Sequence, residues 1–480
     1  MAAAQGLAVE GVDTPTVDCG SFRDPSGFVC HLGDQIFRAV DGACREMVRE
    51  LHQAGMLDSL RKRAGLLHTR TVEPDEPVHA QLHRHYPDVD SFLWHERVPF
   101  ISYPYEWTVS MLADAGVCCL DLQLMLVEQG YTLKDASAYN MQFAGGEIVF
   151  IDIPSIVKTP RRDMWTALDQ FYRMFLYPLL LSRHGRSSLK EYFLSHIDGL
   201  ELAEVYRRFG FSGSLWTAML DLWLPRQLHR LVSGKTVALR ERVEQKQGDA
   251  RPLIMNLRRL RGKLHRLGVA GEPDSRWTGY RDDNSYDDAA EKQKIDFVDR
   301  CLEQCTPRRV LDVGCNTGRY SELAADRGAM VVAIDSDSGC IDRLYRGAQA
   351  SKRDILPLVV DLANPSPGIG FRSVERTAFE DRCSFDCVLA LALVHHLLVS
   401  ARLPLPAIRD LFADLSASHL VVEYVDPADP MFQAVLAVRE DLYGDFNESR
   451  FRSVFEERFT LIRRDSIGPH RTLFFFEKRL

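Results

Sequence analysis

The segment from Val310 to Arg319 constrains the fold of this chain most. It reads Val-Leu-Asp-Val-Gly-Cys-Asn-Thr-Gly-Arg, so a short apolar run leads directly into a loop of small residues. Glycine reaches backbone conformations that other residues avoid, and it lets a ligand approach the main chain without meeting a Cβ atom. A strand, a loop of this kind and a helix in succession indicate an open α/β sheet with a ligand site at the loop.

Four further apolar runs follow, at residues 330–334, 355–360, 386–393 and 419–425. The segments between them are long enough for crossover helices, so the pattern predicts a parallel sheet covered on both faces. Residues 459–479 add two strand-like runs around a Gly-Pro turn, which predict an antiparallel hairpin. The fold class expected for this half is α/β, a doubly wound Rossmann-like sheet with an antiparallel terminal strand.

Three of these strands carry an aspartate at or near their carboxyl ends, namely Asp312, Asp335 and Asp361. Because the carboxyl ends of parallel strands meet at one edge of a sheet, we expect the three side chains along one crevice. An acid at the end of the second strand is placed to accept hydrogen bonds from both hydroxyls of a ribose.

The runs VLDVGCNTG, AIDSD and LVVDLA resemble the first three motifs of class I S-adenosylmethionine-dependent methyltransferases, over about residues 277–480. The resemblance implies that Gly314 and Gly318 border the methionine part of S-adenosylmethionine, that Asp335 holds the ribose and that Asp361 lies near the adenine. Asn316 replaces the usual middle glycine, and asparagine tolerates left-handed backbone. An NAD site would instead require G-x-G-x-x-G. The predicted cofactor-binding residues are Asp312, Gly314, Asn316, Gly318, Asp335, Asp361 and Tyr280.

Candidate catalytic residues follow the fourth and fifth strands. Methyl transfer is an in-line displacement, so it needs alignment of the acceptor and, for a hydroxyl acceptor, a base that removes the proton. Histidine suits that task near neutral pH. We therefore predict His395, His396 and Glu423 as catalytic residues, with helix-start packing and helix capping as the structural alternatives.

The first half of the chain has a different pattern of apolar residues. Residues 27–40 predict two short strands around a turn, residues 107–129 predict a helix, and residues 163–235 have mostly helical spacing. An α+β, helix-rich domain is expected over residues 1–235, a helical linker over 236–276 and the methyltransferase-like domain over 277–480.

Asp135, Asn140 and Asp152 stand around a short predicted hairpin and can converge on one divalent metal and a hydroxyl. The pattern resembles the catalytic loop and metal-binding aspartate of protein-kinase-like and aminoglycoside-phosphotransferase-like enzymes. The resemblance implies Asp135 as base, Asn140 and Asp152 as Mg²⁺ ligands and ATP as a possible second cofactor. No glycine-rich phosphate loop precedes them, and Arg38 stands where the nucleotide lysine is expected, so we predict a degenerate kinase-like domain.

Charge and cysteine content limit the partners. The 480 residues include 59 Lys and Arg against 67 Asp and Glu, so nothing attracts the whole chain to nucleic acid or to an anionic membrane. The odd number of cysteines, 11, and the lack of a basic-then-apolar leader or membrane span predict reduced thiols in a cytoplasmic protein. His79 and His83 have helical ligand spacing without nearby Cys or paired acids, so we predict no metal site.

Taken together, the two halves are similar to a bacterial group of nodulation-protein-like methyltransferases, with HERVPFISYPYEW at residues 95–107 among the shared segments. The expected function is transfer of the methyl group of S-adenosylmethionine to an oxygen or nitrogen of a small-molecule or sugar acceptor. The alternative is a bifunctional kinase-methyltransferase that acts on a glycan or small hydroxylated substrate. A non-catalytic partner-binding protein is a third hypothesis, and the oligomeric state is left open.

Overall fold

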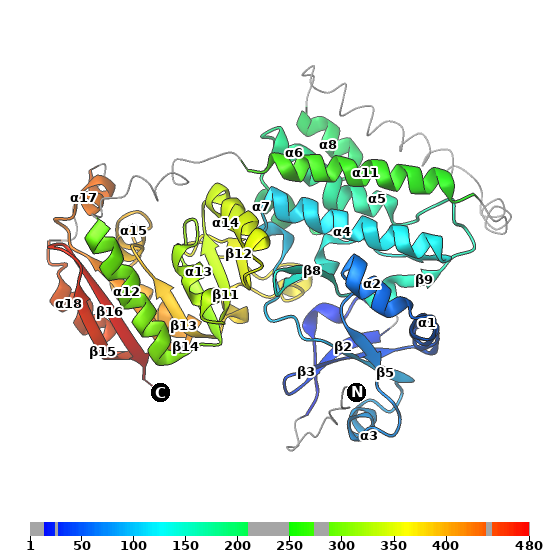
Figure 1. Ribbon diagram of the computed structural model, residues 1–480, viewed down its shortest axis with the longest axis horizontal. Coiled ribbons are helices and arrows are strands. Elements are labelled where there is room, and N and C mark those ends of the chain that lie inside the picture. Colours follow the sequence, from blue (N-terminus) through cyan, green and yellow to red (C-terminus); the bar gives the residue numbers. More distant parts are fainter. Residues whose placement is uncertain (1–13, 25–26, 210–248, 273–287, 438–443, 480) are drawn as a thin grey trace.

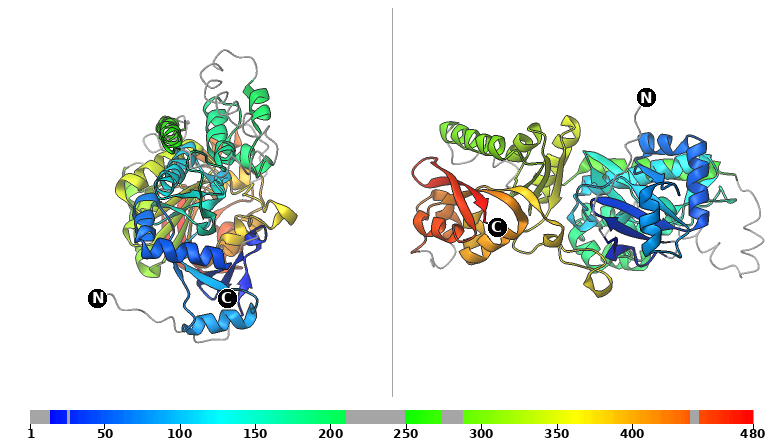
Figure 2. Two further views of the ribbon diagram at one scale, coloured as in Figure 1. Left: turned by 90° about the vertical axis from the view of Figure 1, so that its right-hand side faces the viewer. Right: turned by 90° about the horizontal axis from the view of Figure 1, so that it is seen from below.

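The computed structural model describes residues 14–24, 27–209, 249–272, 288–437 and 444–479. The chain forms two units, which lie side by side along the long axis of the molecule (Figures 1 and 2). The unit coloured blue to green comes from the first half of the chain, and the unit coloured yellow to red contains the predicted Rossmann-like sheet.

The N-terminal unit begins with an antiparallel sheet of order β1-β2-β3-β5-β4. The hairpin of β2 (Gly27–Leu32) and β3 (Gln35–Val40) confirms the two predicted strands. Two helices follow this hairpin, α1 and α2, and the chain turns between them at Gly55 with φ +65°. The other bounds in this part are β1 Thr16–Val17, α1 Gly42–Gln53, α2 Met56–Ala64, β4 Thr69–Thr71, α3 Pro77–His85 and β5 Ser91–His95.

Helices make up most of the remaining N-terminal unit. The long apolar helix α4 (Val109–Glu128) confirms the helix predicted over residues 107–129, and it would be long enough to cross a membrane, but 67% of its most apolar window is buried inside the protein. The elements after it are β6 Tyr131–Leu133, β7 Met141–Ala144, β8 Glu147–Phe150, β9 Ile156–Lys158, α5 Leu168–Phe171, α6 Tyr177–Arg183, α7 Leu189–Ser195 and α8 Leu202–Phe209. Strand β6 pairs with β9, and β7 pairs with β8 as the predicted hairpin.

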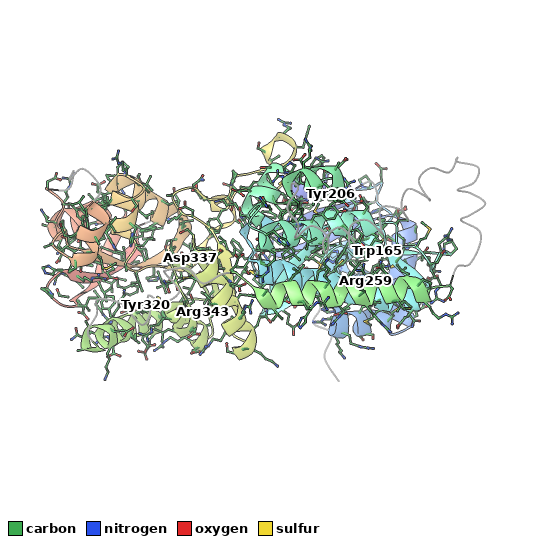
Figure 3. All side chains as sticks on the ribbon, turned by 90° about the horizontal axis from the view of Figure 1, so that it is seen from above. Trp165, Tyr206, Arg259, Tyr320, Asp337 and Arg343 are labelled. Carbon is green, nitrogen blue, oxygen red and sulfur yellow. The ribbon has the colours of Figure 1, made fainter. Side chains whose placement is uncertain are left out.

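The expected linker helix is part of the N-terminal core. Helix α11 (Arg251–Ala270) lies along α4, while its Arg259 faces away from the core (Figure 3). The helix predicted within the helical linker over 236–276 is therefore present as α11, and its apolar stripe is buried against neighbouring helices. The buried residues of the stripe are Leu253, Leu257, Leu260 and Leu264.

The C-terminal unit is built on a seven-stranded sheet of order β12-β11-β10-β13-β14-β16-β15. The first five strands in this order are parallel, and the hairpin of β15 and β16 lies at one edge with β16 antiparallel to both β14 and β15, which confirms the predicted doubly wound sheet and terminal hairpin. The strands are β10 Arg309–Val313, β11 Met330–Asp335, β12 Ile355–Val359, β13 Phe385–Ala390, β14 Ser416–Val425, β15 Phe459–Ser466 and β16 Arg471–Lys478.

Apolar side chains pack on both faces of this sheet. Val310 belongs to the buried cluster that includes α12 (Asp288–Cys305), whereas the next residue, Leu311, belongs to the cluster on the opposite face. Alternation along a strand that is buried on both faces produces the continuous apolar runs from which the strands are predicted. The remaining helices are α13 Arg319–Asp326, α14 Ser338–Ser351, α15 Val394–Val399, α16 Leu405–Leu415, α17 Pro430–Leu436 and α18 Glu448–Phe455.

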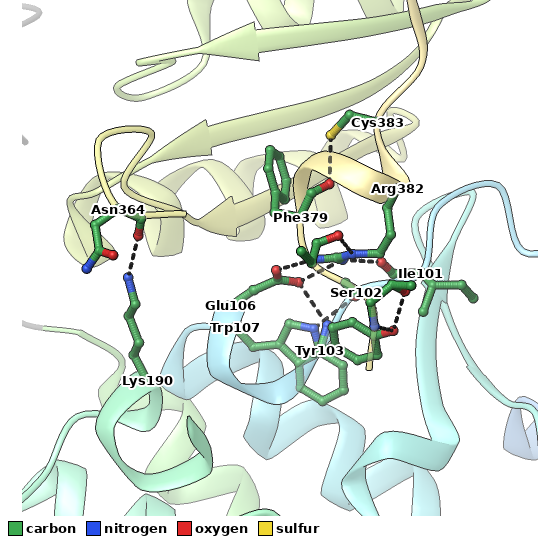
Figure 4. A network of polar contacts seen from close by, with 12 residues as sticks. Ile101, Ser102, Tyr103, Glu106, Trp107, Lys190, Asn364, Phe379, Arg382 and Cys383 are labelled. Carbon is green, nitrogen blue, oxygen red and sulfur yellow. Dashed lines mark hydrogen bonds and ion pairs between the residues drawn. The ribbon is translucent and has the colours of Figure 1, made fainter. Parts of the chain in front are cut away.

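The two units share a buried polar seam (Figure 4). Arg382, in the loop before β13, binds Glu106 of the N-terminal unit, with Nη2 and Oε1 2.5 Å apart. The hydroxyl of Tyr103 accepts a hydrogen bond from the backbone N–H of Thr377 at 3.2 Å. A second contact joins the hairpin β7–β8 to α14, where the side-chain amide of Gln349 donates to the carbonyl of Gly146 at 2.9 Å. These contacts fix one unit against the other.

Candidate functional site

A cleft of about 690 Å³ lies at the carboxyl ends of β10 to β13. Most of the predicted cofactor-binding residues line this one cleft, because the parallel strands bring their loops to the same edge of the sheet. Among the described residues, Gly318 does not line it, and Tyr280 lies outside the described residues. The predicted residues that line the cleft are Asp312, Gly314, Asn316, Asp335, Asp361 and His396.

The loop after β10 turns through three left-handed residues. Gly314, Asn316 and Gly318 have φ angles of +70°, +50° and +87°. A Cβ atom on Gly318 would lie 2.2 Å from Cδ1 of Leu344, so glycine is required there for the loop to pack on α14. Asn316 adopts the left-handed conformation that its residue type tolerates, as expected for the replaced middle glycine.

Asp335 ties this loop to the end of β11. One of its carboxylate oxygens accepts the backbone N–H of Asn316 at 2.9 Å, and the other accepts that of Asp337 at 3.0 Å. Burial raises the pKa of Asp335 above its ordinary value. A carboxylate has about four acceptor positions, so acceptor capacity remains on the side that lines the cleft.

Asp312 and Asp361 line different parts of the cleft. Asp312 is almost completely buried, accepts the hydroxyl of Ser321 at 2.5 Å, and has a pKa raised to about 6 by burial. Asp361 is half-buried and accepts the backbone N–H of Ala363 at 2.9 Å. The cleft therefore presents two carboxyl groups of raised pKa, those of Asp312 and Asp335, and the half-buried Asp361.

The two predicted catalytic histidines occupy different environments. His396 lines the cleft, whereas His395 is only 3% exposed, stacks on Phe432 with ring centroids 6.2 Å apart, and is not among the lining residues. Burial lowers the pKa of His395 well below its ordinary value. The ring of His395 is buried outside the lining of the cleft, so its surroundings do not favour a direct catalytic contact, which stays a prediction.

Glu423 is also placed differently from the prediction. Its side chain is fully buried and does not line the cleft; it is surrounded by hydrogen-bond donors. One oxygen accepts Lys294 Nζ at 2.6 Å and the backbone N–H of Ala392 at 2.8 Å, and the other accepts Arg471 Nη1 at 3.3 Å. A carboxylate enclosed in this way has its charge taken up by neighbouring donors, which does not favour the direct catalytic role predicted for Glu423; that role stays a prediction.

In the N-terminal unit, Asp135, Asn140 and Asp152 lie around the hairpin β7–β8. The carbonyl of Asn140 accepts the backbone N–H of Ile151 at 2.9 Å, which holds the two ends of the hairpin together. Asp152 is partly buried, with its side chain 16% exposed; this burial raises its pKa, and it pairs with Arg38 at 2.8 Å. The Asp135 charge lies close enough to raise the pKa of Asp152 further. The fold thus brings the predicted acidic pair together beside an arginine.

Comparison with known proteins places both halves in one family. The chain is 32% identical over 489 residues to nodulation protein NoeA of Rhizobium meliloti strain 1021, and the match covers 99% of each chain. The protein belongs to the NoeA family. Residues 286–466 of this NoeA-family protein match the family model described as a methyltransferase domain. The protein is therefore an S-adenosylmethionine-dependent methyltransferase.

Two further similarities concern only part of the NoeA-family protein. A segment of 103 residues is 32% identical to ubiquinone biosynthesis O-methyltransferase of Alkalilimnicola ehrlichii, covering 22% of this chain and 37% of that protein. The crystal structure of N-methyltransferase NodS from Bradyrhizobium japonicum WM9 is 16% identical, with a TM-score of 0.30, and the match covers 40% of this chain and 98% of NodS.

Lys294 of this NoeA-family protein is a cleft residue that was not predicted from the sequence. Its side chain is 4% exposed, lines the cleft and pairs with Glu423. A signal was present, since Lys294 precedes the buried Phe297 and Val298 by three and four residues and so shares the apolar face of α12. A lysine on the apolar face of a helix indicates a buried partner.

Proposed function

We propose that the methyl group of S-adenosylmethionine is transferred to an oxygen or nitrogen of a small-molecule or sugar acceptor in the cleft at β10 to β13. The proposal rests on one observation above all: a cleft of about 690 Å³, within the range of small-molecule sites, has His396 in its wall. The bound cofactor supplies a methyl group on a positively charged sulfur. The chain's own residues must hold it, align the acceptor and take the proton.

The residues at the cleft suit this cofactor. Gly314 leaves the main chain open on one side, and Asp335 has acceptor capacity for ribose hydroxyls. Carboxylates in the wall favour a cationic sulfonium. The acidic residues in the lining are Glu291, Asp312, Asp335, Asp337 and Asp361.

The same charges disfavour a polyanionic acceptor. The described residues that line the cleft include one lysine, Lys294, and one arginine, Arg319. Lys294 pairs with Glu423, and Arg319 pairs with Glu291. Nucleic acid is bound through several basic contacts to phosphates. A neutral, hydroxylated acceptor therefore fits this cleft better than a nucleic acid.

For a hydroxyl acceptor, His396 is the candidate base. Its position at the start of α15 places the imidazole in the wall of the cleft, where it can take the acceptor proton while the methyl group is transferred. An amine acceptor attacks through the lone pair of its neutral form while the bond between the methyl group and sulfur breaks, and the resulting ammonium then gives its proton to a base or to water. Incubation with radiolabelled S-adenosylmethionine and fractionated extract tests the proposal: label in a low-molecular-mass fraction supports it, and label in nucleic acid or protein alone contradicts it.

We further infer that the N-terminal unit is a kinase-like domain that positions the acceptor. The antiparallel sheet followed by helices, and the hairpin between Asn140 and Asp152, support this inference. Arg38 argues against phosphoryl transfer, because it binds both Asp152 and Asp24, the latter at 2.6 Å, and so neutralises the carboxylate that Mg²⁺ would need.

The bifunctional kinase-methyltransferase is the second candidate, and a binding experiment separates the two. Calorimetry with ATP and Mg²⁺ should detect no binding to the wild-type protein if the N-terminal unit only positions the acceptor. Binding that depends on Mg²⁺ and disappears in Asp152→Ala but persists in the matched Asp24→Ala variant would favour the bifunctional enzyme instead.

A further inference from the structure

Ala392 has an unusual backbone conformation at the end of β13. Its φ angle is +52°, in the left-handed region that costs a residue with a Cβ atom free energy unless neighbouring groups stabilise it. Ala392 and Leu393 both line the cofactor cleft, and α15 with His396 begins directly after them. The conformation of Ala392 therefore sets the course of the wall that carries the candidate base.

The hydrogen bond that holds this conformation comes from Glu423. Its Oε2 accepts the backbone N–H of Ala392 at 2.8 Å from the end of the neighbouring strand β14. Leu393, the next residue, lies close to the glycine loop, since a Cβ atom on Gly314 would be 3.2 Å from its Cδ1. A shift of Ala392 would thus move the apolar wall against the loop on which the cofactor is expected to lie.

Lys294 allows Glu423 to remain charged in this buried place. The same Oε2 accepts Lys294 Nζ at 2.6 Å, and Arg471 on the other oxygen is itself paired with Asp429 at 2.7 Å. The four side chains hold two positive and two negative charges and are at most 6% exposed. A buried carboxylate without such partners would take up a proton and weaken as an acceptor.

We propose that Glu423 and Lys294 are positioning residues of the methyltransferase, which hold Ala392 in its left-handed conformation and so shape the cleft wall from Leu391 to His396 for cofactor binding. Neither residue needs to touch the reacting atoms. The inference rests on the proposed use of this cleft for S-adenosylmethionine.

Two matched double variants isolate the hydrogen bond to Ala392. Lys294→Met with Glu423→Gln removes both charges and keeps an acceptor oxygen, while Lys294→Met with Glu423→Leu removes both charges and the acceptor. Affinity for S-adenosylhomocysteine, measured by calorimetry on the full chain, should be about tenfold weaker in the leucine pair, the size of one lost hydrogen bond. Thermal unfolding of each variant establishes that it is folded at the temperature of measurement.

Ala392→Gly added to the leucine pair gives the decisive test, because glycine adopts the left-handed conformation without a Cβ penalty. It should restore most of the affinity lost in the leucine pair, and Ala392→Gly in the otherwise wild-type protein is measured beside it as the reference. Equal affinities in the two double variants, or no rescue by glycine, would overturn the positioning role while leaving the methyltransferase assignment intact. Failure of the wild-type protein to bind S-adenosylhomocysteine would overturn the use of the cleft and the positioning role together.

Discussion

Arg382 and Glu106 form an ion pair that joins the two units, and both side chains are almost fully shielded from water, at 7% and 0% exposure. The guanidinium also lies over the ring of Tyr103, with its carbon 4.6 Å from the ring centroid. Glu106 in turn accepts the backbone N–H of Tyr103 at 3.0 Å. The pair is thus held by several groups from both units, and its loss should affect the whole protein.

Removal of one partner of the Arg382–Glu106 pair should lower the free energy of unfolding far more than removal of both. Arg382→Met leaves the Glu106 carboxylate buried without its cation, which should lower the free energy of unfolding by about 3–5 kcal/mol. The double variant Arg382→Met with Glu106→Gln should recover a large part of that loss. Chemical denaturation measures both values, and an unchanged denaturation midpoint in Arg382→Met would contradict a stabilising seam.

Asp335 should dominate cofactor affinity. In Asp335→Ala, the acceptors for the ribose and for the backbone N–H of Asn316 are both lost, so the dissociation constant for S-adenosylhomocysteine should rise by about 30-fold or more. Asp335→Asn keeps one acceptor oxygen, so its dissociation constant should lie between those of Asp335→Ala and the wild type. Calorimetry at pH 7.5 gives the constants, and equal affinity in Asp335→Ala and wild type would refute the assignment.

His396 should affect turnover and leave cofactor affinity nearly unchanged. If the imidazole removes the acceptor proton, His396→Ala should reduce the rate of methyl transfer by about 10²–10⁴-fold. The neighbouring His395→Asn is the control, because that ring is buried outside the lining of the cleft and its replacement should alter stability more than rate. The measurement is label transfer from S-adenosylmethionine at saturating cofactor; wild-type turnover in His396→Ala would exclude it as base.

Asp312 should make stability fall as the pH rises through the mildly acidic range. Burial raises its pKa to about 6, so between its ordinary value of 3.8 and about 6 the unfolded chain loses a proton that the folded protein retains. The contribution of Asp312 to the free energy of unfolding is complete below pH 3.8 and lost above about pH 6. The difference is about 3 kcal/mol. Asp312→Asn should therefore gain stability relative to wild type from pH 4 to 6.5, measured by urea denaturation; parallel pH profiles would contradict this.

The strands of the C-terminal sheet could be predicted because each is an apolar run of the right length. β10 covers the apolar run that begins at Val310, and the acids at the ends of β11 and β12 mark the cleft edge correctly. This works because strands buried on both faces need only apolar residues, which are visible without knowledge of their neighbours.

The supports of the cleft could not be predicted because they depend on residues distant in the sequence. Lys294 and Glu423 are 129 positions apart, and the strained Ala392 looks like any other small residue in the run 386–393. The burial of α11 similarly required α4 as its partner. Local patterns find the elements, but the partner of a side chain and its protonation follow from tertiary packing.

The seam between the units also limits how this protein can be divided or recombined. A methyltransferase half released on its own would expose Arg382 and the ring of Phe379 that packs against it, and a transplanted first half would carry an orphaned Glu106. Replacement of either half by a related module would require the other side of the seam to be redesigned with it, so the two halves are expected to change in concert.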